Sequence, residues 1–267
     1  MSRSGPPHSP TPPGTATPGG VRVTLDHVRV ERGRDTVLRV DSLAMGPGST
    51  ALVGPNGSGK STLLHVVAGL LPPADGTVTF DGADPDDGRR VAYVLQSQPG
   101  SEHLLVTARE VVALAASSRR LLGRLRTDER AAVDEVMERL EVADLASRHL
   151  AEMSGGQRQR VLIAQGLAQR APVLLLDEPV AGLDLASERT IRRAIDDERA
   201  AGRTVIVATH DLHEAQRADR VVLLASHVVA HGLPAEVLRS ENLREAYRGH
   251  VLELDDGSIA VDDDHHR

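Results

Sequence analysis

GPNGSGKS, residues Gly54–Ser61, stands between a short apolar strand and a segment with helical periodicity. It fits the phosphate-loop pattern G-x-x-x-x-G-K-[ST] in the context that this pattern requires. Its glycines allow backbone N–H groups to converge on phosphate oxygens, and the N-terminus of the following helix favours negative charge. A glycine-rich structural turn is the less fitting interpretation. The residues that we expect to bind the nucleotide are Gly54, Pro55, Asn56, Gly57, Ser58, Gly59, Lys60, Ser61 and Thr62.

Two side chains of this loop and two carboxylates further along the chain suit phosphate chemistry. Lys60 would reach the β- and γ-phosphates, and the Ser61 hydroxyl would bind Mg²⁺. LLLDEP, residues 174–179, places Asp177 and Glu178 at the carboxyl end of a buried strand, the edge where ligands bind in open α/β sheets. Asp177 would hold Mg²⁺ through water, and Glu178 would be the base for the attacking water. The alternative is a pair of solvated carboxylates at a strand exit.

MSGGQ, residues Met153–Gln157, is a second motif of unusual composition. A Ser hydroxyl, glycine amides and a helix N-terminus can bind an anion, although the same residues could form only an N-cap turn. The motif lies too far along the chain from the phosphate loop to serve the same nucleotide. We therefore expect one chain to carry two halves of an ATP site, with a partner completing each half.

The remainder alternates between apolar strands and helical segments, which predicts an α/β fold with a mostly parallel sheet. Strands are expected at 21–30, 49–54, 76–80, 91–95, 173–177, 204–210 and 220–225. Helical segments are expected after Lys60 and at 107–116, 127–148, 158–170, 187–201 and 212–218. A short helical pair and a last hairpin are expected from Pro234 onward.

Composition excludes several classes of protein. The formal net charge of −7 argues against a dedicated nucleic-acid binder, and the absence of Cys excludes disulfides and thiolate metal sites. No apolar run is long enough to cross a bilayer, and residues 1–20 show no secretory signal, so we expect the chain to stay inside the cell. Residues 1–20 are rich in Pro, Gly, Ser and Thr, which predicts a disordered tail.

The order of the motifs resembles that of the nucleotide-binding subunits of ATP-binding cassette (ABC) transporters, over residues 21–250. The resemblance implies a P-loop NTPase (RecA-like) core, an N-terminal antiparallel β subdomain and an inserted α-helical subdomain at about residues 97–170. Residues 251–267 would then form a C-terminal hairpin and an acidic tail that also carries histidines.

The resemblance also gives roles to individual residues. Gln96 would sense Mg²⁺ and water at the junction with the helical subdomain; Gln98 is a weaker candidate, and an exposed Gln at a strand end is the alternative. His210, in VATHD, would bind the γ-phosphate and orient water near Glu178. Asp184, in AGLD, would contact the phosphate loop of the other subunit. Ser154, Gly155, Gly156 and Gln157 would cap the γ-phosphate that the other subunit binds.

Two positions depart from the family pattern. Members usually carry an aromatic residue that stacks on adenine just before the first glycine of the N-terminal hairpin, where this chain has Arg32 before Gly33. A guanidinium can also stack on a base, so Arg32 is included among the candidate binding residues. Met153 replaces the usual Leu, a substitution that conserves volume and that we expect to be silent.

The resemblance implies an ATPase that uses ATP and Mg²⁺ and closes as a head-to-tail dimer, expected to be two identical chains. The expected partners are a multi-span membrane permease and an extracytoplasmic substrate-binding protein, with no nucleic acid. The chain would lie on the cytoplasmic face of the membrane. Segments such as QSQPGSEHLLVTAREVVAL look most like subunits of zinc or manganese importers, and importers of iron chelates (siderophore or haem) are the second interpretation.

Two other classes of protein remain as alternatives. One is a soluble ABC ATPase that does not transport; such relatives carry long coiled coils or two cassettes, and this chain shows neither heptads nor a repeat. The other is a regulator that binds nucleotide without hydrolysis, against which Glu178 and His210 argue. Histidines in the last fifth of the chain allow a metal-sensing hypothesis, although a solvated tail is the better interpretation.

Overall fold

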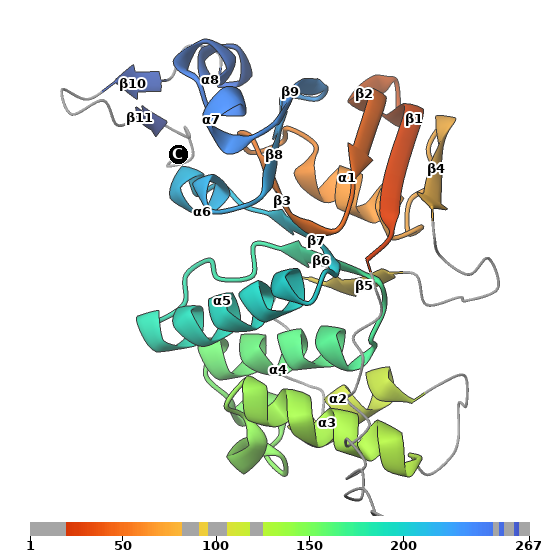
Figure 1. Cartoon of the computed structure of the whole chain (residues 1–267), viewed down its shortest axis with the longest axis vertical. Helices are drawn as coiled ribbons and strands as arrows, with labels where there is room; N and C mark the ends of the chain where they lie inside the picture. The colour runs from red at the N-terminus through yellow and green to blue at the C-terminus, as the bar shows by residue number, and fades with distance from the viewer. Residues whose placement is uncertain are drawn as a thin grey trace, which may run out of the picture.

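The phosphate loop lies in a chain whose described residues form a three-stranded sheet, a six-stranded sheet, a two-stranded pair and several helices (Figure 1). The computed structural model describes residues 20–81, 91–95, 106–117, 125–247, 251–253 and 259–261, the last two segments by their backbone alone. The first 19 residues, Gln96, Gln98 and the histidines of the last six residues therefore lie outside the described residues. The domain boundaries expected from the sequence stay a prediction.

The N-terminal sheet is antiparallel and has the strand order β2-β1-β4. Its strands are β1 (Arg22–Arg32), β2 (Asp35–Met45) and β4 (Asp75–Asp81). Alternate residues of β1 are buried, as its period-two pattern predicts, and Gly33 adopts a positive φ of 68° in the turn to β2. The expected antiparallel β subdomain is confirmed.

The second sheet has the order β5-β6-β7-β3-β8-β9, and all its neighbours are parallel except β8 and β9. Its strands are β3 (Gly48–Val53), β5 (Val91–Val94), β6 (Val173–Asp177), β7 (Thr204–Ala208), β8 (Arg220–Leu224) and β9 (Val228–Gly232). The expected mostly parallel sheet is therefore confirmed. β7 ends two residues before His210, so that histidine belongs to the loop after the strand. Because β3, β6 and β7 are parallel, the residues that follow them meet at one edge.

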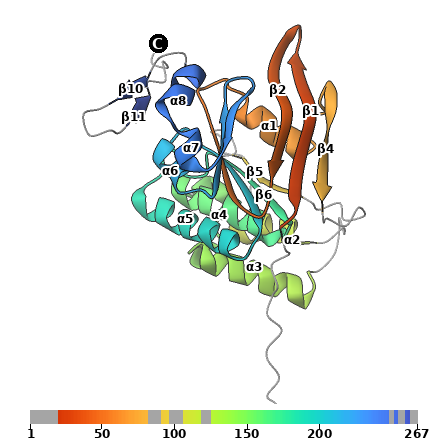
Figure 2. The same cartoon turned by 45° about the horizontal axis from the view of Figure 1, so that its top comes forward.

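Helices pack against both faces of the second sheet. α1 (Lys60–Val67) packs between the two sheets, where its buried residues share one apolar core with β1, β2, β6 and β7 (Figure 2). The group seen below the sheet in Figure 1 consists of α2 (Ala108–Ala116), α3 (Thr127–Arg139), α4 (Gly155–Ala168) and α5 (Leu185–Ala200). The predicted apolar face of α3 is buried, with Val133 and Met137 at most 1% exposed.

The remaining helices lie toward the C-terminus. They are α6 (Leu212–Gln216), α7 (Pro234–Val237) and α8 (Ser240–Ala246), followed by the antiparallel pair β10 (Val251–Glu253) and β11 (Ile259–Val261). The short helical pair and the hairpin expected after Pro234 are both present. Among the described residues, every helix is too short or too polar to span a bilayer.

Candidate nucleotide site

The phosphate loop connects β3 to α1, and its three glycines, Gly54, Gly57 and Gly59, take positive-φ conformations that other residues avoid. Gly54 has a φ of 151°, and a Cβ added there would lie 2.2 Å from the carbonyl oxygen of Leu224. Gly59 caps α1 with a φ of 99°. The loop therefore holds its backbone N–H groups at the positive end of a helix, a geometry that suits phosphate.

Lys60 lies across this loop. Its Nζ donates hydrogen bonds to the carbonyl oxygens of Gly54, at 2.6 Å, and Pro55, at 3.1 Å. The side chain is buried, with 7% of its surface exposed, so the charge stays beside the loop backbone. The role expected for Lys60 toward a bound triphosphate stays a prediction.

A cavity of about 670 Å³ opens over the loop. It brings together residues from three distant parts of the sequence: the β1–β2 hairpin, the phosphate loop with α1, and the end of β6. Its lining includes Glu31, Arg32, Val37, Asn56, Gly57, Ser58, Gly59, Lys60, Ser61, Thr62, His65, Leu70, Leu71 and Glu178. The volume falls within the usual range of small-molecule sites, and binding of the base beside Arg32 stays a prediction.

Glu178 leaves β6 in a left-handed conformation, with a φ of 46°. Its backbone N–H donates to the carbonyl oxygen of Ala208 at 2.9 Å, which ties it to the neighbouring strand β7. Its Oε1 lies 3.4 Å from Nδ1 of His210. Such a conformation in a residue other than glycine costs about 1–3 kcal/mol and often marks a functional position. Glu178 and His210 thus meet at the edge of the cavity.

Asp177 has a neighbour that sequence reasoning missed. The hydroxyl of Tyr93, on β5, donates to Oδ2 of Asp177 at 3.3 Å. Burial, together with the nearby Asp177 charge, raises the pKa of Tyr93, so the phenol remains a hydrogen-bond donor at neutral pH. The ring of His65 packs edge-on against Tyr93, with ring centroids 5.6 Å apart. The sequence offers only a weak indication of this contact, because alternation along the strand VAYVL places Tyr93 and Val91 on one face of the sheet.

Ser154–Gln157 forms a capping box at the start of α4. The Ser154 hydroxyl accepts from the Gln157 N–H at 3.3 Å, and the Gln157 side chain accepts from the Ser154 N–H at 3.1 Å. The N-cap interpretation is thus confirmed for the isolated chain, and it leaves Ser154 and Gly155 exposed. The motif does not belong to the described residues that line the cavity over the phosphate loop.

Asp184 lies beside this motif, a relationship that the sequence did not reveal. It caps α5 by accepting from the backbone N–H of Ala186 and of Ser187. The hydrogen bonds from Ser187 lower the pKa of Asp184, which keeps its carboxylate ionised. A Cβ added at Gly156 would lie 2.7 Å from Oδ2 of Asp184 and 2.3 Å from Oγ of Ser187. Only glycine therefore lets α4 approach the start of α5 so closely.

The predicted residues thus fall into two groups. Residues 56–62 of the phosphate loop, Arg32 and Glu178 line one cavity, with His210 beside Glu178 and Asp177 beside Tyr93. Gly54 and Pro55 lie outside this lining and accept hydrogen bonds from Lys60. Ser154–Gln157 and Asp184 form the second group. Gln96 lies outside the described residues.

The residues present also fit Mg²⁺ bound together with a nucleotide. Mg²⁺ prefers oxygen ligands, and it is usually held by one or two protein oxygens together with phosphate oxygens and water. The Ser61 hydroxyl at the start of α1 and the Asp177 carboxylate at the end of β6 supply such oxygens. No group of three or more acidic or histidine side chains able to hold a metal occurs within the part of the chain that the structure describes. The oxygens of Ser61 and Asp177 therefore suit a Mg²⁺ ion that binds as a complex with the nucleotide.

Comparison with known proteins agrees with this geometry. The family model described as ABC transporter matches residues 38–181. The chain is 41% identical to the hemin import ATP-binding protein HmuV of Streptomyces coelicolor, over 90% of this chain and 88% of the relative. It is 35% identical to the manganese transport system ATP-binding protein MntB of Bacillus subtilis, over 89% of this chain and 97% of the relative. A solved ATP-binding subunit of an ABC transporter has a TM-score of 0.71 and 26% identity, over 84% of this chain and 95% of that one.

The strand order and the phosphate loop beneath the cavity define a P-loop NTPase fold. The matched model and the relatives place the chain in the ABC transporter family of ATP-binding subunits. It is an ATPase that binds ATP, and it belongs to the importers within that family. Subunits of this kind work as dimers on a membrane permease.

Proposed function

We propose that this chain hydrolyses ATP to drive import of a transition-metal ion of the zinc or manganese kind through a separate multi-span permease. The contact between Glu178 and His210 beside the phosphate loop carries the enzymatic part of the proposal. The similarity to the manganese transport subunit supports the cargo. Two identical chains would lie on the cytoplasmic face of the membrane, with an extracytoplasmic substrate-binding protein on the other side.

The two groups of site residues support a shared ATP site. Each ATP would lie between the phosphate loop of one chain and Ser154–Gln157 of the other, with Asp184 at the same boundary. The γ-phosphate makes contacts that exist only in the closed dimer, so ATP binding favours closure and hydrolysis releases it. The exposed position of Ser154 and Gly155 at a helix N-terminus is consistent with this arrangement.

In the hydrolysis step, water attacks the γ-phosphorus and the bond to the ADP oxygen breaks. Glu178 would accept the proton of that water, and His210 would donate a hydrogen bond to the γ-phosphate from beside the same carboxylate. Lys60 would neutralise charge on the β- and γ-phosphates. Mg²⁺, held by Ser61, by Asp177 through water and by Gln96, would neutralise the phosphate charge further.

A second candidate cargo is haem or another iron chelate, which the greater identity to the hemin import subunit favours. The cassette does not itself contact the cargo, so its fold and motifs are compatible with either one. Cargo must therefore be measured in the cell that carries the whole transporter.

The experiment compares uptake of radioactive zinc, manganese and iron-labelled haem in a deletion strain complemented with the wild-type chain or with Lys60→Ala. We expect wild type, and not Lys60→Ala, to restore uptake of zinc or manganese. If only haem uptake is restored, the cargo is haem and not zinc or manganese. If none of the three is restored while the purified chain still hydrolyses ATP, both cargo proposals are wrong.

A further inference from the structure

Thr209, the residue before His210, is fixed by three hydrogen bonds. Its N–H donates to the carbonyl oxygen of Leu52, at 3.0 Å, and its Oγ1 accepts from the N–H of Asp211, at 3.1 Å. Its hydroxyl donates to Oε2 of Glu214 at 2.6 Å. The Thr209 side chain therefore controls the backbone on both sides of His210.

Glu214 decides the direction of this hydroxyl. A carboxylate only accepts hydrogen bonds, so the hydroxyl hydrogen of Thr209 must point at Glu214, and an oxygen lone pair remains for the N–H of Asp211. Hydrogen bonds to ionised acceptors are about twice as strong as those between neutral groups. Glu214 is on α6 and is mostly buried, with 13% of its side chain exposed.

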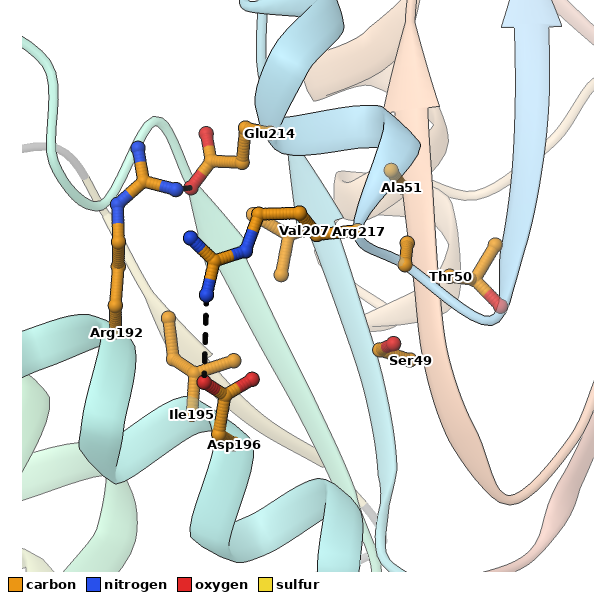
Figure 3. Close-up of a pocket in the computed structure, with 10 residues that line it drawn as sticks. Ser49, Thr50, Ala51, Arg192, Ile195, Asp196, Val207, Glu214 and Arg217 are labelled. Carbon is orange, nitrogen blue, oxygen red and sulfur yellow. Dashed lines mark ion pairs between the residues drawn. The ribbon is translucent and has the colours of Figure 1, made fainter. Parts of the chain in front are cut away.

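Arg192 holds Glu214 from the opposite side. Its Nη1 lies 3.6 Å from Oε1 of Glu214, and its Nε donates to Glu188 at 2.9 Å. Figure 3 shows the Arg192 guanidinium, from α5, pointing at the Glu214 carboxylate, and both residues line a cavity between α5, α6 and the sheet. Both oxygens of Glu214 thus have partners, one on Arg192 and the other on Thr209.

We propose that Glu214 is a positioning residue for ATP hydrolysis: held by Arg192, it orients Thr209 and thereby fixes His210 beside Glu178. The proposal rests on the role proposed above for His210. The carboxylate of Glu214 binds the residue beside His210 and faces the cavity between α5 and α6, so it would act on the reaction through the loop alone. A displacement of about 1 Å in a catalytic group can reduce a rate by up to about 100-fold.

The test uses steady-state kinetics of the full chain. Thr209→Val removes the hydroxyl with little change of shape, and we expect its kcat to fall about tenfold with KM for ATP within about twofold of wild type. Thr209→Ser keeps the hydroxyl and should restore kcat. Glu214→Gln keeps an acceptor for Thr209 but loses the ion pair with Arg192, so its kcat should lie between the two.

A matched control comes from the same cavity. Arg217 pairs with Asp196 at 4.0 Å, and both side chains are mostly exposed (Figure 3). Arg217→Gln should therefore leave kcat unchanged. Thermal melting of each variant separates a lost orientation from a lost fold; if Thr209→Val unfolds, the comparison rests on Glu214→Gln and Thr209→Ser.

A double variant tests whether Thr209 affects kcat through His210. In the His210→Ala background, Thr209→Val should change the residual rate, measured with radioactive ATP, by less than about twofold, because its target is gone. An equal tenfold loss in both backgrounds would overturn the proposal. A wild-type kcat for Thr209→Val alongside a strong defect in His210→Ala would overturn the positioning role alone. A wild-type kcat for His210→Ala would overturn the role of His210 and, with it, this proposal.

Discussion

Nδ1 of His210 lies 3.4 Å from Oε1 of Glu178, although 32 residues separate them in the chain. The register of two parallel strands produces this contact, because Asp177 on β6 pairs with Ala208 on β7. Each functional residue follows the end of its strand by one or two positions. The pair is open to its surroundings, since 56% of the His210 side chain and 21% of the Glu178 side chain are exposed.

Glu178→Gln should reduce kcat by about 100-fold or more while ATP binding persists, because a general base contributes about that much and the amide cannot take the proton. We expect this variant to accumulate as an ATP-bound dimer, detectable by size-exclusion chromatography with ATP. The control is Glu241→Gln, an exposed carboxylate on α8. Normal turnover in Glu178→Gln would mean that another group is the base.

Arg32→Ala should weaken ATP binding about 2- to 5-fold, the equivalent of about 0.5–1 kcal/mol for a cation over an aromatic ring. Arg32 lines the cavity, and the neighbouring Glu31 pairs with Arg29 at 2.5 Å. Calorimetric titration with inorganic triphosphate is the control, because it lacks the base. An equal loss of affinity for ATP and for inorganic triphosphate would show that Arg32 binds phosphate. If the Arg32 side chain stacks on adenine, Arg32→Tyr should preserve ATP binding.

Gly54→Ala and Gly57→Ala should differ in stability, although both replace a phosphate-loop glycine with a positive φ. At Gly57 nothing lies within 4 Å of an added Cβ, so strain alone costs about 1 kcal/mol. At Gly54 the Cβ would meet the carbonyl oxygen of Leu224, raising the cost to about 3 kcal/mol. Urea unfolding of both variants measures the difference, and similar midpoints would contradict the steric argument.

Asp219→Asn should lower stability near neutral pH, and the deficit should shrink in acid. Arg199 and the backbone and hydroxyl of Ser49 bind the carboxylate, and the Arg199 hydrogen bond is the main cause that lowers the pKa of Asp219 to about 2. Because the pKa of Asp219 is lower in the folded chain than in the unfolded chain, its carboxylate stabilises the fold fully above the unfolded-state pKa of about 3.9. This stability is lost as the pH falls toward 2.

Urea midpoints of wild type and Asp219→Asn between pH 3 and 7 check this dependence. Asp41→Asn is the control, because Asp41 pairs with Arg39 where both side chains are at least 66% exposed. The urea midpoints of wild type and Asp219→Asn should differ by a constant amount from pH 7 to about pH 5 and by less at pH 3. A deficit that is independent of pH would mean that the Asp219 charge does not cause it.

Much of the fold was predictable because the signals are local. The buried strands such as 173–177 and the face of α3 follow from apolar patterns, and Gly54–Ser61 identifies its own strand–loop–helix context. Boundaries were less predictable: β7 ends at Ala208, before the expected His210, because Ala208 is the last residue of this strand that pairs in register with β3 and β6. Family resemblance, rather than residue patterns alone, identified Asp184 and His210 as candidates.

The amino-acid sequence alone was enough to indicate a nucleotide-binding α/β protein, because phosphate loops and buried parallel strands are encoded in short contiguous stretches. The contacts of Tyr93 with Asp177, of Gly156 with Asp184, and of Arg192 with Glu214 emerged only once the chain was folded. Each of these pairs comes from two different elements. Their distances depend on strand register and on how closely helices pack, and neither is written in the residues of one segment.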